Sequence, residues 1–211
     1  MKNLILGTNP QIDDSAVVGY LTGRKIEIKP TVIGDNARIR SNTVIYTNVL
    51  IGNNLETGHN VVIREENKIG NDFSIWNSST IDYRCEIGDK VRIHCNVYVA
   101  QFTVIEDEVF LAPGVKIAND LHPICTRCMK GPIIKRGARV GVNVTLLPNI
   151  TIGEYTVIGA GSVVTKDIPP KTLAYGNPAR PIKSVDELKC LSGNSDKPYI
   201  NGVDVRTRSR S

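Results

Sequence analysis

The chain has 211 residues, a formal net charge of +5, and only 5% aromatic residues among 41% hydrophobic ones. This length suits one domain, or one domain with a small appendage, and the scarcity of aromatics favours many thin layers over one bulky core. The basic excess favours anionic ligands such as phosphates, but no basic run is interleaved with aromatics, so we expect no nucleic-acid partner.

The first residues, Met1 to Gly7, contain an apolar run that is too short for a signal peptide. No later stretch approaches the roughly 18 apolar residues of a membrane span. The five cysteines are odd in number and scattered, unlike a disulfide framework. These features predict a cytoplasmic protein with reduced thiols and no membrane span.

A six-residue repeat fills most of the chain. Aliphatic residues occupy every sixth position from Ile33 to Ile117, with Thr57 as the exception, and the pattern resumes from Ile134 to Val164. Four residues after each aliphatic comes a second position that is mostly small or β-branched. No helix or ordinary hairpin meander keeps this period, so both positions must face inward in a stack of repeats.

Glycine directly follows the aliphatic at Gly34, Gly52, Gly70 and Gly88, at intervals of eighteen residues. Three hexads therefore form one coil of three short strands and three turns, which closes a triangle. We interpret these glycines as corner residues, because glycine tolerates backbone angles that other residues resist.

The repeat also sets the expected boundaries. Residues 1–29 keep it only in fragments and are predicted to form an irregular N-terminal cap, followed by the β-helix over 30–170. The spacing from Ile117 to Ile134 is seventeen residues rather than eighteen, which predicts an excursion loop over 118–133. A C-terminal extension, 171–211, is expected to hold a short helix beginning at Ser184, with Glu187 at its capping-box position, and a loose tail from about Ser192.

The repeated hexads resemble those of the hexapeptide-repeat acyltransferases over about residues 30–183. Examples are Ile-Gly-Asp-Asn-Ala-Arg at 33–38 and Ile-Gly-Ala-Gly-Ser-Val at 158–163. The resemblance implies an all-β, left-handed parallel β-helix, a homotrimer, and active sites between subunits. The left hand comes from the family alone, because the general rule for parallel crossovers predicts the right-handed form.

The segment from His122-Pro123 to Arg180 looks like the sugar O-acetyltransferases of this superfamily. In those enzymes a His-Pro in the excursion supplies the catalytic imidazole, and His122 is the matching residue. An imidazole can take a proton from an attacking hydroxyl or amine near neutral pH. Alternatively His122 is an exposed or metal-bound side chain, since His122, Cys125 and Cys128 have a spacing that could bind zinc with a fourth ligand from a neighbouring chain.

The stretch 91–114 is similar to N-acetyltransferases that act on nucleotide-linked amino sugars in surface-polysaccharide pathways. There the residue matching Asn96 helps to hold the sugar amine, so Asn96 joins His122 as a candidate catalytic residue. The alternative is an asparagine that hydrogen-bonds the stack. We expect the hexad of Asn96 to lie one layer beneath the excursion, so that Asn96 and His122 face one cleft.

Three further residues are predicted to bind the substrate: His94, at a corner beside Asn96, and Asn119 and Asp120, at the start of the excursion. The N-acetyltransferases commonly have a different residue at the position of His94, which puts its role in doubt.

Acetyl-CoA, by resemblance, lies along the later coils. The residues expected to bind it are the backbone of Gly141, Val142, Gly159 and Ala160 and the side chains of Lys166 and Arg180. Backbone groups would meet the pantetheine arm and polarise the thioester carbonyl, and the two cations would pair with phosphates. Val142 replaces a small residue often found there, which would narrow the path of the arm.

The resulting hypothesis is acetyl transfer from acetyl-CoA to the amine of a nucleotide-linked amino sugar, with a sugar hydroxyl as the alternative acceptor. A γ-type carbonic anhydrase fits poorly, because His59, His94 and His122 do not match its ligand spacing. A structural or regulatory β-helix subunit is the non-enzymatic alternative, and Lys166 and Asn96 argue against it.

Overall fold

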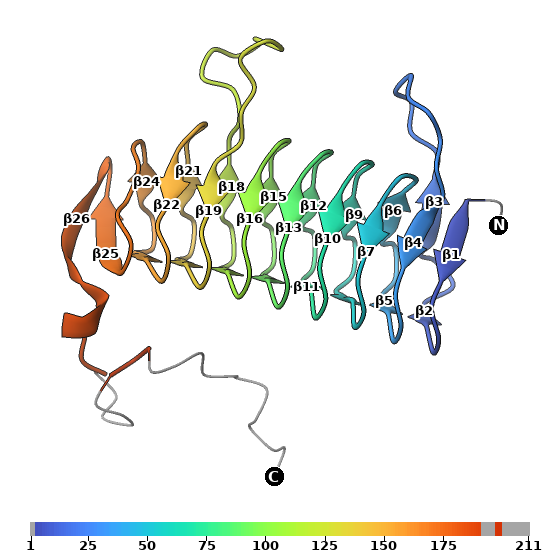
Figure 1. Cartoon of the computed structure of the whole chain (residues 1–211), viewed down its shortest axis with the longest axis horizontal. Helices are drawn as coiled ribbons and strands as arrows, with labels where there is room; N and C mark the ends of the chain where they lie inside the picture. Colours follow the sequence, from blue (N-terminus) through green and yellow to red (C-terminus); the bar gives the residue numbers. More distant parts are fainter. Residues whose placement is uncertain (1–2, 191–196, 200–211) are drawn as a thin grey trace.

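A computed structural model describes residues 3–190 and 197–199 of the chain. The chain winds into a stack of triangular coils, and each coil places one short strand in each of three sheets (Figure 1). Every strand from β1 to β21 pairs in parallel with the strand three places further along the chain. The protein is therefore an all-β, left-handed parallel β-helix, as its repeat and family resemblance predict.

Three sheets make up the sides of the stack. Sheet A contains β1 (Leu4–Leu6), β4 (Thr31–Ile33), β7 (Leu50–Ile51), β10 (Lys68–Ile69), β13 (Glu86–Ile87), β16 (Val104–Ile105), β19 (Ile133–Ile134) and β22 (Thr151–Ile152). Sheet B contains β2 (Gln11–Ile12), β5 (Arg38–Ile39), β8 (Glu56–Thr57), β11 (Ser74–Ile75), β14 (Arg92–Ile93), β17 (Phe110–Leu111), β20 (Arg139–Val140), β23 (Val157–Ile158), β25 (Thr172–Gly176) and β26 (Ala179–Ser184). Sheet C contains β3 (Val17–Tyr20), β6 (Val44–Tyr46), β9 (Val62–Ile63), β12 (Thr80–Ile81), β15 (Tyr98–Val99), β18 (Lys116–Ile117), β21 (Thr145–Leu146) and β24 (Val163–Val164).

The core is the column of inward side chains inside the prism. The aliphatics of the hexad stack on one another in register, as Ile51, Ile69 and Ile87 do in sheet A. Thr57, the exception in the repeat, is also buried, and its hydroxyl oxygen accepts a hydrogen bond from the backbone N–H of Arg40 at 2.9 Å. A polar residue is tolerated at this position because its oxygen has a partner.

The corner glycines have a different cause from the one that we expected. Positive φ occurs two residues after each of them, as at Asn36 (φ 58°) and Asp72 (φ 55°), and not at Gly34 or Gly70. A Cβ on Gly70 would instead collide with Oδ1 of Asp89 and with the backbone of the next coil. Glycine is needed for close approach between coils, not for its backbone freedom.

A ladder of side-chain oxygens explains this close approach at the AB corner, defined as the turns that lead from sheet A to sheet B. Each Asn or Asp oxygen accepts a hydrogen bond from the equivalent backbone N–H one coil earlier. The successive bonds run from Asp35 N to Asn53 (2.8 Å), Asn53 N to Asn71 (2.9 Å), Asn71 N to Asp89 (2.6 Å) and Asp89 N to Asp107 (2.9 Å). The ladder satisfies corner amides that the strands leave unpaired.

The two ends of the stack differ. Strands β1 to β3 pair with β4 to β6, so residues 4–20 form a first coil that is more regular than its fragmentary repeat indicates, followed by a loop over 21–30. At the other end β25 and β26 form an antiparallel hairpin. The predicted short helix is one 3₁₀ turn, Val185–Glu187, with the N-cap Ser184 and the capping box that its sequence indicates. Of the predicted loose tail, residues 191–196 and 200–211 lie outside the described residues.

No helix in the described ranges is both long and apolar enough to cross a membrane.

The ladder predicts that Gly70→Ala destabilises the stack. The added methyl group has to displace the Asp89 carboxylate or the next coil, at a cost of about 1–3 kcal/mol, typical of overpacking. Gly23→Ala is the matched control, because nothing lies within 4 Å of a Cβ at Gly23. Denaturant unfolding of the two variants tests this, and equal stabilities would contradict the close-approach explanation.

Candidate active site

Six of the predicted site residues share one corner of the prism. The BC corner is defined here as the set of turns that lead from sheet B to sheet C. It carries the residues that follow β14, β20 and β23 of sheet B, namely His94 and Asn96, Gly141 and Val142, and Gly159 and Ala160. The fold therefore brings four of the predicted acetyl-CoA residues to the same corner as Asn96 and His94.

Asn96 occupies the left-handed position of its turn, with φ 57°. Its backbone N–H donates to the carbonyl of Asn77 at 3.0 Å, and its own carbonyl accepts from Lys116 Nζ at 2.5 Å. The residue is exposed, and its side-chain amide makes no hydrogen bond within the described chain. The backbone thus serves the stack and leaves the side-chain amide available for a ligand.

His94 is held in one orientation beside Asn96. Its Nδ1 accepts a hydrogen bond from the backbone N–H of Cys95 at 3.0 Å, and its ring packs edge-on against Phe110 with centroids 6.4 Å apart. With Nδ1 as the acceptor, the neutral ring carries its proton on Nε2. The outer nitrogen of His94 is then a donor, which suits binding a substrate oxygen rather than removing a proton.

In the later coils of this corner, two backbone N–H groups find no acceptor among the described residues. The amides of Gly141 and Gly159 belong to the coil ladder, donating to Ile158 O at 2.9 Å and Ala174 O at 2.8 Å. The next amides, those of Val142 and Ala160, donate to no group in the part of the chain that the structure describes. In the earlier coils the equivalent amides at the AB corner, from Asp35 to Asp89, are taken by the Asn and Asp ladder. In the later coils the BC corner presents two stacked donors, the amides of Val142 and Ala160.

The excursion leaves the stack at a different corner. The CA corner, defined as the turns from sheet C to sheet A, carries the loop over 118–132 between β18 and β19. Figure 1 shows that the earlier loop over 21–30 projects from the same edge of the stack. Lys166, which follows β24, also lies at the CA corner, whereas Arg180 lies in the closing hairpin. Both side chains are exposed.

The expectation that Asn96 and His122 share a cleft within one chain is wrong. Neighbouring hexads occupy successive corners of the triangle, and only residues eighteen apart stack at the same corner. The hexad of Asn96 ends at the BC corner, and the excursion of His122 begins at the CA corner. A single chain therefore does not bring these two side chains together.

Asp120 organises the excursion. Its carboxylate accepts the backbone N–H of His122 at 2.8 Å and that of Cys125 at 2.7 Å. The foot of the loop is closed by a bond of 2.7 Å from the N–H of Lys130 to the carbonyl of Asn119. The imidazole of His122 is exposed and has no partner in the described residues. Roles of Asn119 and Asp120 in substrate binding stay predictions.

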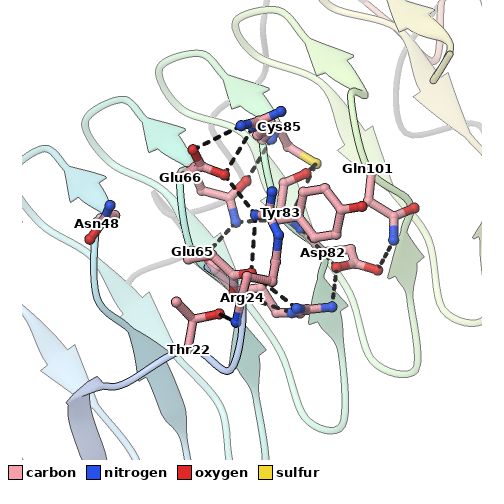
Figure 2. A network of polar contacts seen from close by, with 12 residues as sticks. Thr22, Arg24, Asn48, Glu65, Glu66, Asp82, Tyr83, Cys85 and Gln101 are labelled. Carbon is pink, nitrogen blue, oxygen red and sulfur yellow. Dashed lines mark hydrogen bonds and ion pairs between the residues drawn. The ribbon is translucent and has the colours of Figure 1, made fainter. Parts of the chain in front are cut away.

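A polar network at the CA corner reaches the foot of the excursion, and Figure 2 shows its part from Arg24 to Gln101. The side-chain NH₂ of Asn119, which is 8% exposed, donates to Gln101 Oε1 at 2.6 Å, and Gln101 donates to the carboxylate of Asp82 at 2.5 Å. Asp82 also accepts from the hydroxyl of Tyr98 at 2.8 Å and from Arg64 at 2.9 Å. Burial and then the bond to Asp82 raise the pKa of Tyr98 to about 12, so it remains a donor.

The same network reaches the loop over 21–30. Arg24 donates to Glu65 at 3.2 Å and to Glu66 at 2.6 Å, and it lies 4.0 Å above the ring of Tyr83. Burial opposes ionisation of Glu65, but hydrogen bonds from its backbone and from Arg24, with the charge of Arg64, hold the pKa of Glu65 below its ordinary value. Arg64 pairs with Glu65 at 3.0 Å and with Asp82 at 2.9 Å, so polar contacts run without a break from Arg24 in one CA-corner loop to Asn119 in the other.

The sequence gives no sign of this network, since its members stand at corner positions where polar residues are common.

Gln101→Met should loosen the excursion while the coils stay intact. Leaving the buried amide of Asn119 unpaired costs roughly 1–3 kcal/mol, and about 1.4 kcal/mol corresponds to a tenfold change in loop opening. The rate at which trypsin cleaves after the exposed Arg127 and Lys130 measures this loop opening, so we expect about tenfold faster cleavage in the variant. Arg84→Gln is the matched control, because Arg84 pairs with Glu66 at the same corner but off the path to Asn119. Equal cleavage in both variants would refute the bracing role.

Metal-binding side chains are sparse at the excursion. No group of three histidine, cysteine or acidic side chains that could hold a metal ion occurs among the described residues. Cys125 and Cys128 lie together, with 2.9 Å between their sulfurs, but the ring of His122 does not join them. The alternative zinc interpretation therefore finds two of its ligands assembled, not three.

Sequence comparison places the chain in a family. Residues 30–65, 84–119 and 131–166 match the family described as bacterial transferase hexapeptide (six repeats). These stretches make up just over half of the chain. The protein belongs to this hexapeptide-repeat transferase family.

Two relatives and one solved structure illustrate the similarity. The chain is similar to the galactoside O-acetyltransferase of Escherichia coli K12, with 37% identity over 115 residues, 47% of this chain and 57% of that enzyme. It is also similar to the dTDP-3-amino-3,6-dideoxy-alpha-D-galactopyranose 3-N-acetyltransferase of Aneurinibacillus thermoaerophilus, 58% identical over 48 residues, 23% of this chain and 25% of that enzyme. The matched chain thus spans about half of the first relative's length and less of the second's.

A UDP-N-acetylglucosamine acyltransferase from Bacteroides fragilis shares the fold, with a TM-score of 0.69, 23% identity, and coverage of 85% of this chain and 69% of that one.

Proposed function

We propose that the protein is an acetyltransferase that transfers the acetyl group of acetyl-CoA to the amine of a nucleotide-linked amino sugar. The observation that carries this proposal is the pair of unpaired amides of Val142 and Ala160, stacked in one column with the available side chain of Asn96. Membership of the transferase family and the similarity to a dTDP-amino-sugar N-acetyltransferase and to a galactoside O-acetyltransferase support it.

The BC corner fits a pantetheine arm. That arm carries amide carbonyls, which need hydrogen-bond donors, and the N–H groups of Val142 and Ala160 supply two. These two donors lie one coil apart, which is about 4.8 Å, the spacing between paired strands. Acetyl-CoA supplies an acetyl group already activated as a thioester. A backbone N–H aimed at the thioester oxygen stabilises the negative charge that builds there during attack. The exposed side chain of Val142 limits the width of this path.

Asn96 serves the acceptor in this proposal. Its side-chain oxygen accepts a hydrogen bond from the N–H of the sugar amine, and this contact orients the nitrogen lone pair toward the acetyl carbon. His94, with its donor on Nε2, binds a sugar or phosphate oxygen. A neutral amine needs little further help, so positioning is the main contribution of the protein.

A homotrimer completes the site. Since Asn96 and His122 lie at different corners of one chain, we place the BC corner of one subunit against the CA corner of the next. His122 of the excursion would then take the proton that the amine releases. Lys166, also at the CA corner, and Arg180 of the hairpin would pair with phosphates.

A second acceptor class, a sugar hydroxyl, is favoured by one observation. The exposed imidazole of His122, without a partner in the described chain, is available as the general base that a hydroxyl requires.

Thiol release from acetyl-CoA, measured with a panel of UDP- and dTDP-linked amino sugars and with plain sugars as controls, tests the function. Asn96→Gly should lower kcat/KM for the amino sugar by about 10–100-fold, because a lost hydrogen bond to a group that becomes charged costs roughly 1.5–3 kcal/mol. Glycine keeps the left-handed turn, and Asn60→Gly is the matched control two coils earlier at the same corner, φ 56°. If His122→Ala abolishes transfer and Asn96→Gly does not, the acceptor is a sugar hydroxyl and not an amine.

Lys166→Gln should weaken acetyl-CoA binding by about fivefold, roughly 1 kcal/mol, as expected for an exposed charge pairing with a phosphate. Lys171→Gln, an exposed lysine at another corner, is the control and should bind normally. Titration calorimetry measures both. If the unaltered protein does not bind acetyl-CoA at all, the result would instead favour a structural or regulatory subunit.

A further inference from the structure

The excursion loop carries a pair of cysteines that acetyl transfer does not use. A hydrogen bond of 2.9 Å joins the sulfurs of Cys125 and Cys128. Cys128 is exposed and Cys125 partly so, and neither is in a disulfide. By contrast, Cys85 is buried among backbone carbonyls, and burial raises the pKa of its thiol to about 12, which keeps it unreactive.

The two thiols of the pair are not equivalent. The hydrogen bond between the two sulfurs, with the N–H groups of Arg127 and Cys128, holds the pKa of Cys125 below its ordinary value, although burial and the Asp120 charge oppose this. The same hydrogen bond raises the pKa of Cys128. Cys125 is therefore the thiol that ionises first and attacks, and Cys128 is the neighbour that completes the exchange.

The backbone already holds the two residues in a closed turn. The N–H of Cys128 donates to the carbonyl of Cys125 at 3.1 Å, and the N–H of Cys125 donates to the Asp120 carboxylate at 2.7 Å. The foot of the loop is fixed independently, by Asn119 and Lys130. A covalent link between the sulfurs can therefore form within this turn while the coils remain unchanged.

From this geometry we infer that Cys125 and Cys128 form a reversible disulfide site that responds to disulfide oxidants such as oxidised glutathione. The Cys125 thiolate attacks one sulfur of the oxidant, which forms a mixed disulfide and releases one glutathione thiolate. Cys128, after losing its proton to solvent, attacks the Cys125 sulfur and releases the second glutathione. Two protein thiols are oxidised to one disulfide, and one oxidant disulfide is reduced to two thiols.

The site is coupled to His122 through one carboxylate. Asp120 accepts the N–H of His122 with one oxygen and the N–H of Cys125 with the other. A disulfide at Cys125 restrains this shared arrangement and so changes the placement of the imidazole. This consequence rests on the proposed function, because it affects the rate of transfer to the acceptor while acetyl-CoA binding at the BC corner stays the same.

The thiol state is measured on the intact protein after equilibration, under argon and with chelator present, in excess oxidised or reduced glutathione. After an acid quench and alkylation, mass spectrometry should show that two of the five thiols are protected in the oxidised sample and exposed again in the reduced one. Trypsin cuts after Arg127, between the two cysteines, so only a disulfide keeps the flanking fragments joined. Cys95→Ser should still lose two thiols, whereas Cys125→Ser and Cys128→Ser should yield no joined fragments.

Three results would overturn the disulfide site. The first is that both cysteines remain alkylated in excess oxidant. The second is a stable glutathione adduct on Cys125 that Cys128 does not displace. The third is protection of the two thiols that persists in reduced glutathione and gives no joined fragments, which would indicate a tightly bound metal ion instead of a disulfide.

Transfer rates of the two forms give the regulatory readout. The oxidised and reduced proteins should differ severalfold in rate at limiting acceptor, with equal acetyl-CoA affinity, and Cys125→Ser, which lacks the attacking thiol, should not respond to glutathione. Equal rates with the disulfide formed would overturn the regulatory consequence alone. Absence of transfer in both forms, with the disulfide still detected, would count against the proposed acetyltransferase and not against the disulfide site.

Discussion

The constraint on which this molecule depends is the parallel hydrogen bonding of one coil to the next. Each strand pairs with the strand one turn further along, so residues eighteen apart stand directly above one another through most of the stack. Side chains therefore act in columns, not as individuals. The buried aliphatic stacks, the Asn and Asp ladder at the AB corner, and the donors at the BC corner are columns that perform different tasks.

The columns also explain what the sequence could reveal. The period of six is visible because inward positions such as Ile81 and Ile93 must be filled in every hexad, and these positions are buried as expected. The short C-terminal turn was predictable for a similar reason, because Ser184 and Glu187 satisfy a local capping rule. Handedness needed the family resemblance, since the general crossover rule points the other way.

The failures have physical causes as well. The corner glycines were assigned to backbone freedom, but the need for space is set by a side chain eighteen residues later, as Asp89 shows for Gly70. The repeat suggests that the hexad of Asn96 lies one layer beneath the excursion of His122, but successive hexads occupy the three corners in rotation, so the two residues stand at different corners. The network around Asp82 was not foreseen because it joins Asn119 to Arg24, residues from two loops that only the coil register brings to the same edge.

Both long loops leave the stack at the CA corner, and the register recovers after each: Leu4 pairs with Thr31, and Val104 pairs with Ile133. The coils thus keep a constant register, and the CA corner is the place where both long loops are inserted. Residues can be inserted there without changing which side chains face inward in later coils. One residue added inside a strand would instead shift the register, so that the inward residues of that strand would point outward. New binding loops, or a change in loop length between related proteins, are therefore expected at this edge, where they leave the donors of the neighbouring corner undisturbed.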